Sequence, residues 1–229
     1  MKTKLSSDKI LIHETWSLDA MLKRLVDLIP QPLAVALQES TESALAQAWQ
    51  EAERFDTPER AQARGQLFHL HAEHAFRLAG DRYGAHNESV ETQPAGGHFS
   101  IVHLPGFVLG RARACSPGTL PRPGKTRRIM ASANAWLSPL QLDFFRNITP
   151  PIPGTIYGVL TAVVGSWKAP GLAWLGVVIP SGDCESILCR ASLQQIIDAH
   201  NTGGTVIVED RARPTLKKRA KKNDDGDDA

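Results

Sequence analysis

Two apolar segments in the second half of this chain restrict its fold more than any other feature. Residues 155–164 (TIYGVLTAVV) and 172–179 (LAWLGVVI) carry no charged side chain and are rich in β-branched residues. Such runs are typical of strands that are covered on both faces. The seven residues between them, 165–171, contain two glycines and a proline, which predicts a hairpin loop and an antiparallel pair. The fold must therefore supply a sheet and other elements that pack on it.

Helices are predicted mainly before this sheet. Apolar residues recur at the spacing of a helix face in the N-terminal part, with Ser17 as a cap for the first helix and Pro30 as its end. Two further helices are expected later in the chain, the first beginning at Ser138 and Pro139. The expected helices span residues 17–29, 32–55, 58–79, 138–148 and 191–200.

Alternating apolar residues predict additional strands. Residues 98–104 and 107–113 flank the turn pair Pro105 and Gly106 and form a second expected hairpin. Short strands are also expected at 127–131 and 205–209. The chain is therefore predicted to be an α+β protein, with an N-terminal helical part followed by a mixed or antiparallel sheet with packed helices.

The order of these elements suggests three parts. The helical part covers residues 1–91, and the polar loop 80–97 leads into an α+β part at 92–210. Residues 211–229 (RARPTLKKRAKKNDDGDDA) form a basic block followed by an acidic one. This tail is too polar to pack and is expected to be disordered.

The chain gives no sign of export or of a membrane span. Its longest apolar stretch, 156–179, is interrupted by glycines, a proline and a lysine, and the N-terminus lacks the apolar core of a signal peptide. Three cysteines, Cys115, Cys184 and Cys189, cannot form a disulfide framework, and no C-x-x-C pair is present for a zinc ribbon. We expect a cytoplasmic protein with buried thiols, without a cofactor and without membrane contact.

The charge of the chain is strongly segregated. Although the formal net charge is only +2, residues 92–142 contain six Lys or Arg side chains and no Asp or Glu. Prolines and glycines in 115–125 are expected to hold part of this charge on an exposed loop between two strands. A segment of one sign creates a local positive field, and such fields attract polyanions.

These observations favour nucleic-acid binding, to RNA or DNA, without catalysis. The arginines lie near Phe107 and Trp136, and Lys168 follows Trp167, so phosphate contacts could combine with stacking of bases on aromatic rings. The residues expected to contact phosphates are Arg111, Arg113, Arg122, Lys125, Arg127 and Arg128, with Lys168 as a helper.

Other functions remain open at this point. His69, His71 and His74 cluster in one predicted helix, and His71 and His74 are one turn apart, so a metal-dependent hydrolase or nuclease is an alternative. A hydrogen-bonded core position is the simpler interpretation of His74. A ribonuclease that uses His98 or His103 with the arginines is a second catalytic alternative. A third is an antitoxin or regulator that binds protein alone.

Gly124, Lys125 and Thr126 resemble part of a phosphate-binding loop, but the residues around them argue against one. The spacing from Gly118 is one residue too long, and Pro121 and Pro123 lack the backbone N–H groups that cradle phosphates. We therefore do not expect a nucleotide-binding loop here.

About a third of the chain resembles a known family. A short helix, the proline-rich break TPPIPG at 149–154, a strand, the turn Ser166, Trp167 and Lys168, and a second strand follow in the order found in the C-terminal part of the small Cas8-like subunit of type IV CRISPR effector complexes. The resemblance implies a non-catalytic subunit of an antiviral ribonucleoprotein that contacts guide RNA or target DNA and docks on neighbouring protein subunits.

Overall fold

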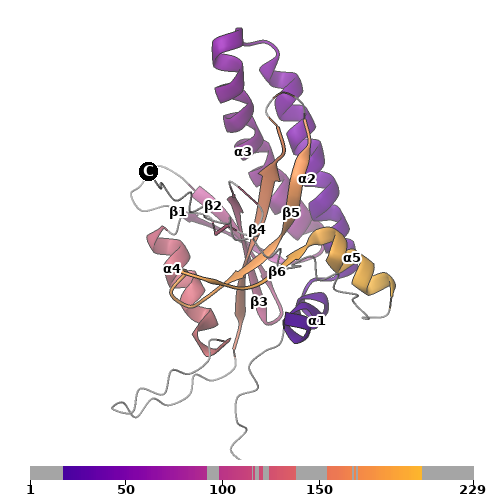
Figure 1. The fold of residues 1–229 in the computed structure, drawn as a ribbon, viewed down its shortest axis with the longest axis vertical. Helices are drawn as coiled ribbons and strands as arrows, with labels where there is room; N and C mark the ends of the chain where they lie inside the picture. Colours follow the sequence, from indigo (N-terminus) through magenta and orange to yellow (C-terminus); the bar gives the residue numbers. More distant parts are fainter. Residues whose placement is uncertain are drawn as a thin grey trace, which may run out of the picture.

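Helices come first along this chain and a six-stranded sheet follows, as Figure 1 shows for the computed structural model. The α+β prediction is thereby confirmed. The structure describes residues 18–91, 98–114, 116, 119–120, 124–137, 154–166, 168 and 170–202.

Three helices precede the first three strands, and the remaining helices lie before and after the last three strands. The helices are α1 (Leu18–Leu28), α2 (Gln31–Ala52), α3 (Thr57–Arg82), α4 (Lys125–Ala131), the 3-10 helix η1 (Ser132–Leu137) and α5 (Leu193–Asn201). The strands are β1 (His86–Glu91), β2 (His98–Leu104), β3 (Phe107–Arg113), β4 (Ile156–Val164), β5 (Leu172–Pro180) and β6 (Ile187–Ser192).

The N-terminal helices form where the apolar spacing predicts them. Pro30 separates α1 from α2, and Pro32 and Pro58 lie in the first turns of α2 and α3, where a missing N–H is tolerated. α2 and α3 pack side by side as an antiparallel pair, and the turn that joins them extends beyond the sheet (Figure 1). At the other end of the chain, α5 begins with a capping box in which Ser192 and Gln195 bond each other's backbone N–H groups.

The sheet is mixed, with the strands in sequence order. β1, β2 and β3 form one antiparallel meander, and β4, β5 and β6 form a second. The meanders join through the parallel pair β3 and β4, which requires a crossover, and α4 and η1 lie in that crossover. The predicted hairpins β2–β3 and β4–β5 are both confirmed, and eight of the nine residues of β4 are buried.

Two apolar clusters cover the two faces of the sheet. The larger one joins α1, α2, α3 and α5 to side chains such as Phe107, Leu109 and Leu160. The smaller one joins α4 to Tyr157 and Val159, which point to the opposite face because side chains alternate along β4. In Figure 1, α4 accordingly lies on the other side of the sheet from α1 and α5.

Two strands were not predicted. β1 lies inside the segment predicted as a polar loop, and therefore within the part predicted to be helical. Its sequence HNESVE offers no apolar alternation, and the backbone ladder to β2 holds it in place. β6 is short and alternates weakly in burial.

Several predictions fall outside the described residues. These are the cap Ser17, the helix at 138–148, the strand at 205–209, the disordered tail at 211–229, and the side chains of Cys115, Arg122 and Trp167. Within the described part, Cys184 and Cys189 are free thiols and both are buried, as expected. No helix among the described residues is both long and apolar enough to cross a membrane.

Candidate nucleic-acid interface

Three of the predicted phosphate-binding residues, Lys125, Arg127 and Arg128, lie together on α4. The strand predicted at 127–131 is therefore wrong. Lys, Arg, Met and Ala all have high helix propensity, and a run of five residues is too short to show which period it follows. The helix begins after Gly124 and continues directly into η1.

The three cationic side chains of α4 differ in their exposure to solvent. Lys125 and Arg128 are exposed, whereas Arg127 is half-buried. The buried hydroxyl of Tyr157 lies beneath α4, and its burial raises the pKa of Tyr157 to about 12, partly opposed by the nearby charge of Arg127 and by a hydrogen bond from it. Arg127 is thus engaged with the protein, and Lys125 and Arg128 are the α4 cations most open to a ligand.

α4 is fixed to the sheet by apolar contacts and by a polar clamp. Ala131 and Met130 pack against the smaller cluster. Just beyond α4, the buried Asn134 donates from Nδ2 to the carbonyl oxygens of Tyr157 and Pro180, and its Oδ1 accepts from the Tyr157 N–H, all at 2.8 Å. The amide of Asn134 therefore satisfies backbone groups at the ends of two strands. No sequence pattern singled out Asn134 or Tyr157.

The turn between β5 and β6 brings acidic residues near the same helix. Cys184 Sγ lies 3.9 Å from the carbonyl oxygen of Arg127, and Asp183 and Glu185 flank this cysteine. Asp183 accepts hydrogen bonds from the Ser181 hydroxyl and from the Glu185 N–H, which lower its pKa and keep it ionised. The positive field of α4 is therefore bounded by negative charge on this side.

Arg111 does not reach the surface. Its side chain is 5% exposed, and Nη1 lies 3.0 Å from Oε2 of Glu73 on α3. The other carboxylate oxygen of Glu73 accepts the Ser100 N–H, and the Arg111 guanidinium lies 6.0 Å from the centre of the Phe68 ring. The prediction that Arg111 belongs to an exposed cationic surface is wrong, because α3 covers this face of β3 and brings in a carboxylate that lies far away in the sequence.

Arg113 shares the strand face of Arg111 but is exposed. His69 of α3 lies beside both arginines, with Nδ1 3.4 Å from Nη1 of Arg111. Burial lowers the pKa of His69, Arg111 and Arg113 lower it further, and Glu73 opposes them.

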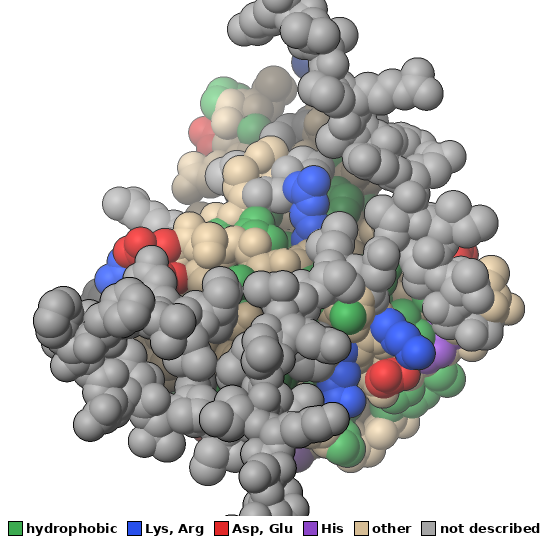
Figure 2. Space-filling view, turned by 60° about the horizontal axis from the view of Figure 1, so that its bottom comes forward, with side chains coloured by type: hydrophobic (Ala, Val, Ile, Leu, Met, Phe, Trp, Pro, Cys, Tyr) green, Lys and Arg blue, Asp and Glu red, His purple; other side chains and the backbone are tan. Residues whose placement is uncertain are grey.

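The predicted cations therefore do not form a single surface in the described residues. Arg111 and Arg113 belong to the face of the sheet that α3 covers, and α4 belongs to the opposite face. Lys168 is exposed in the loop between β4 and β5. Figure 2 shows one side of the molecule, on which Lys and Arg side chains lie at separate places and some adjoin Asp or Glu.

The histidines of α3 do not form a metal centre among the described residues, where no three His, Cys, Asp or Glu side chains are grouped to hold an ion. His71 Nε2 lies 3.1 Å from Glu51 Oε2 of α2. His74 is exposed, so its interpretation as a core histidine is wrong: the buried side of α3 carries Phe68 and Phe76 instead.

The two histidines considered for a histidine-based ribonuclease both lie in β2. His103 Nε2 lies 3.1 Å from Glu88 Oε2, and the His103 ring stands 5.5 Å from that of His86. These three residues share one face of the β1–β2 ladder, whereas His98 falls on the other face. His98 and His103, either of which this alternative could use with the arginines, therefore lie on opposite faces of the sheet.

No protein-family model, curated protein or solved structure matches this chain.

Proposed function

We propose that this chain is a non-catalytic nucleic-acid-binding protein that contacts phosphates through α4. The observation that carries the proposal is the pair Lys125 and Arg128, both exposed on a helix that is anchored to the sheet. They are three residues apart and thus neighbours on the helix surface, where both can approach one strand of a polyanion. The surrounding segment, 92–142, contributes no carboxylate of its own.

The likeness of residues 130–200 to the small Cas8-like subunit supports a more specific form of this proposal. The chain would then be a cytoplasmic subunit of an RNA-guided effector complex that holds guide RNA or target DNA beside other protein subunits. Arg113, Arg122 and Lys168 remain proposed helpers, whereas Arg111 has a structural role. The rim of Asp183 and Glu185 would confine the polyanion to the side of α4 away from the β5–β6 turn.

A salt titration tests this proposal. Binding of labelled single-stranded RNA, single-stranded DNA and duplex DNA is measured by filter retention between 50 and 300 mM salt, on the order of the range over which counterion release is visible. The affinity is expected to fall with salt. In the double variant Lys125→Ala/Arg128→Ala, the slope for a single strand is expected to be shallower by about 1.4, because each lost phosphate contact removes about 0.7.

The matched control is Lys23→Ala/Arg24→Ala, which removes two exposed cations from α1. The control is expected to bind like the wild type. Absence of binding by the wild type, or an equal loss in both double variants, would refute a phosphate-binding role for α4.

A further inference from the structure

α4 exposes one large apolar side chain beside its two exposed cations. Ile129 is 61% exposed, directly follows Arg128, and lies four residues, or ~6 Å along the axis, after Lys125. Residues three and four apart are neighbours on a helix surface, so these three side chains form one exposed patch. A single exposed apolar side chain is ordinary on a protein surface. What distinguishes Ile129 is the surface that surrounds it.

That surface changes in character along the chain. Both exposed cations of α4 precede Ile129. The exposed residues that follow it, in η1, are small and uncharged: Ser132, Ala133 and Ala135. The Ser132 hydroxyl donates to the carbonyl oxygen of Ile129 at 2.6 Å and is thus engaged within the chain. Residues 124–137 contain no Asp or Glu. A cationic half is therefore followed by an uncharged half, and Ile129 lies at the boundary.

A nucleotide in a single strand has the same division. Its phosphate is charged, whereas the face of its base is a π surface that packs on protein side chains once the base leaves the stack. In a duplex the bases are paired and stacked on each other, so a helix that lies along the backbone meets phosphates and sugars. Ile129 would gain no apolar contact there. The patch therefore matches a single strand better than a duplex.

We propose that α4 binds single-stranded nucleic acid, with phosphates on Lys125 and Arg128 and one unstacked base on Ile129. This inference rests on the phosphate-binding role proposed above and adds the class of ligand. The patch is also held in place before binding, because α4 packs on the smaller apolar cluster and the Asn134 clamp follows it directly. A site on a rigid element loses little conformational freedom when the ligand binds.

An abasic strand separates the base contact from the phosphate contacts. Fluorescence anisotropy measures binding of three labelled probes: a DNA single strand, an abasic strand of the same length that keeps every phosphate and sugar, and the duplex of the first strand. The wild type is expected to bind the base-bearing strand about tenfold more tightly than the abasic one, which is the magnitude expected when one apolar side chain of this size leaves water.

Two substitutions at Ile129 test its role. Ile129→Ser is expected to remove most of the preference for the base-bearing strand and to leave the salt slope unchanged, because the lost side chain is uncharged and releases no counterions. Its affinity for the abasic strand and for the duplex is expected to equal that of the wild type. Ile129→Trp is expected to increase the preference, since an indole ring stacks on a base. A folding defect would instead weaken the binding of all three probes.

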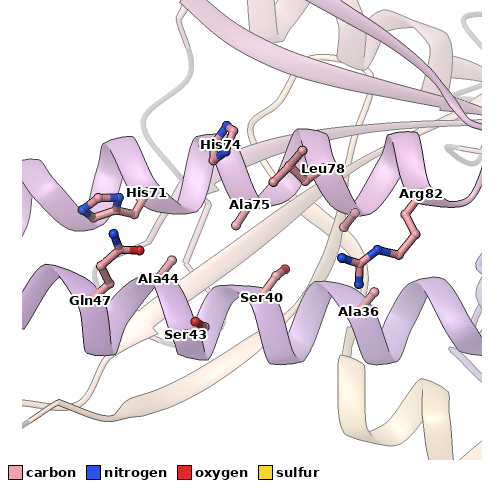
Figure 3. Close-up of a pocket in the computed structure, with 11 residues that line it drawn as sticks. Ala36, Ser40, Ser43, Ala44, Gln47, His71, His74, Ala75, Leu78 and Arg82 are labelled. Atoms are coloured by element: carbon pink, nitrogen blue, oxygen red, sulfur yellow. The ribbon is translucent and has the colours of Figure 1, made fainter.

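Leu78→Ser is the matched control. Leu78 is 48% exposed on α3 and, like Ile129, lies four residues from a cationic side chain, in this case Arg82; Figure 3 shows both at the groove between α2 and α3. This variant is expected to bind every probe as the wild type does.

Three results would overturn the base contact and leave the phosphate-binding role intact. The first is equal affinity of the wild type for the base-bearing and abasic strands. The second is an Ile129→Ser variant that loses as much affinity for the duplex as for the single strand. The third is an equal loss in Leu78→Ser. A wild type that binds none of the probes would overturn both proposals.

Discussion

The guanidinium of Arg111 and the carboxylate of Glu73 meet at 3.0 Å inside the protein, where a strand of the sheet faces the longest helix. Both side chains are largely buried, with 5% and 16% exposure. Burial lowers the pKa of Arg111, and the adjacent Glu73 opposes that change. The ion pair connects α3 to β3. Arg111 is therefore part of the buried interior, although in the sequence it lies in a segment whose charged side chains are all cationic.

Removing one member of this pair is expected to destabilise the protein. In Arg111→Met, Glu73 keeps the Ser100 N–H but loses its cation, and an uncompensated buried charge costs about 3–5 kcal/mol. Urea unfolding followed by circular dichroism measures the loss. The control is Arg113→Met, two residues along the same strand face but exposed, for which a change within about 0.5 kcal/mol is expected. Equal losses in the two variants would mean that the buried pair contributes nothing specific.

Replacing Asn134 is expected to destabilise the protein as much as replacing a buried apolar residue. Asn134→Leu keeps a similar volume but leaves the Tyr157 N–H and the carbonyls of Tyr157 and Pro180 without this partner. Each buried group left unpaired costs about 1–3 kcal/mol. The control is Asn201→Leu, which loses only an exposed hydrogen bond from Gln31. If urea unfolding gives the same free energy for both variants, the clamp has no special role.

The predictable part of the fold is the part that local pattern determines. The hairpins β2–β3 and β4–β5 follow from alternation and turn residues, and α5 follows from an amphipathic face ended by glycines. α4 and β1 were missed because neither shows an apolar period: α4 is short and basic, and β1 is polar and exposed on one edge of the sheet.

The candidate site was predictable only in part, for a related reason. Alternation correctly placed Arg111 and Arg113 on one face of β3, but no local signal shows that α3 covers that face at Arg111. Glu73 is 38 residues away from Arg111 in the sequence, so their pairing is a product of tertiary packing. Residues 92–142 contain no Asp or Glu, but folding brings Glu73 of α3 against Arg111 in this segment. The local sequence does not show that contact.

His69 should make stability depend on pH. Its pKa in the folded protein is lowered from 6.5, first by burial and then by Arg111, so the folded state favours the neutral ring. The stabilisation is complete above pH 6.5 and is lost as the pH falls through the lowered pKa, because the unfolded chain takes up the proton more readily. We expect the loss of stability between pH 7.5 and 5 to be smaller in His69→Gln than in the wild type. An NMR titration that places the ring pKa at or above 6.5 would contradict this expectation.

Adding one methyl group to β5, at Gly176, is expected to weaken the pairing of β5 with β6. A Cβ added to Gly176 would lie 2.2 Å from the carbonyl oxygen of Ala191 and 2.7 Å from Cα of Ser192, both of them backbone atoms of β6. Backbone atoms in a paired strand cannot move aside cheaply, so Gly176→Ala is expected to cost at least the ~1–3 kcal/mol typical of overpacking.

Hydrogen exchange locates that effect. Amides of β6 and of α5, which follows β6 directly, are expected to exchange faster in Gly176→Ala, whereas those of β2 should change little. Gly171→Ala is the control, because a Cβ there meets no atom within 4 Å. If both variants unfold at the same urea concentration, the close approach of Gly176 to the β6 backbone does not limit which side chain fits at this position.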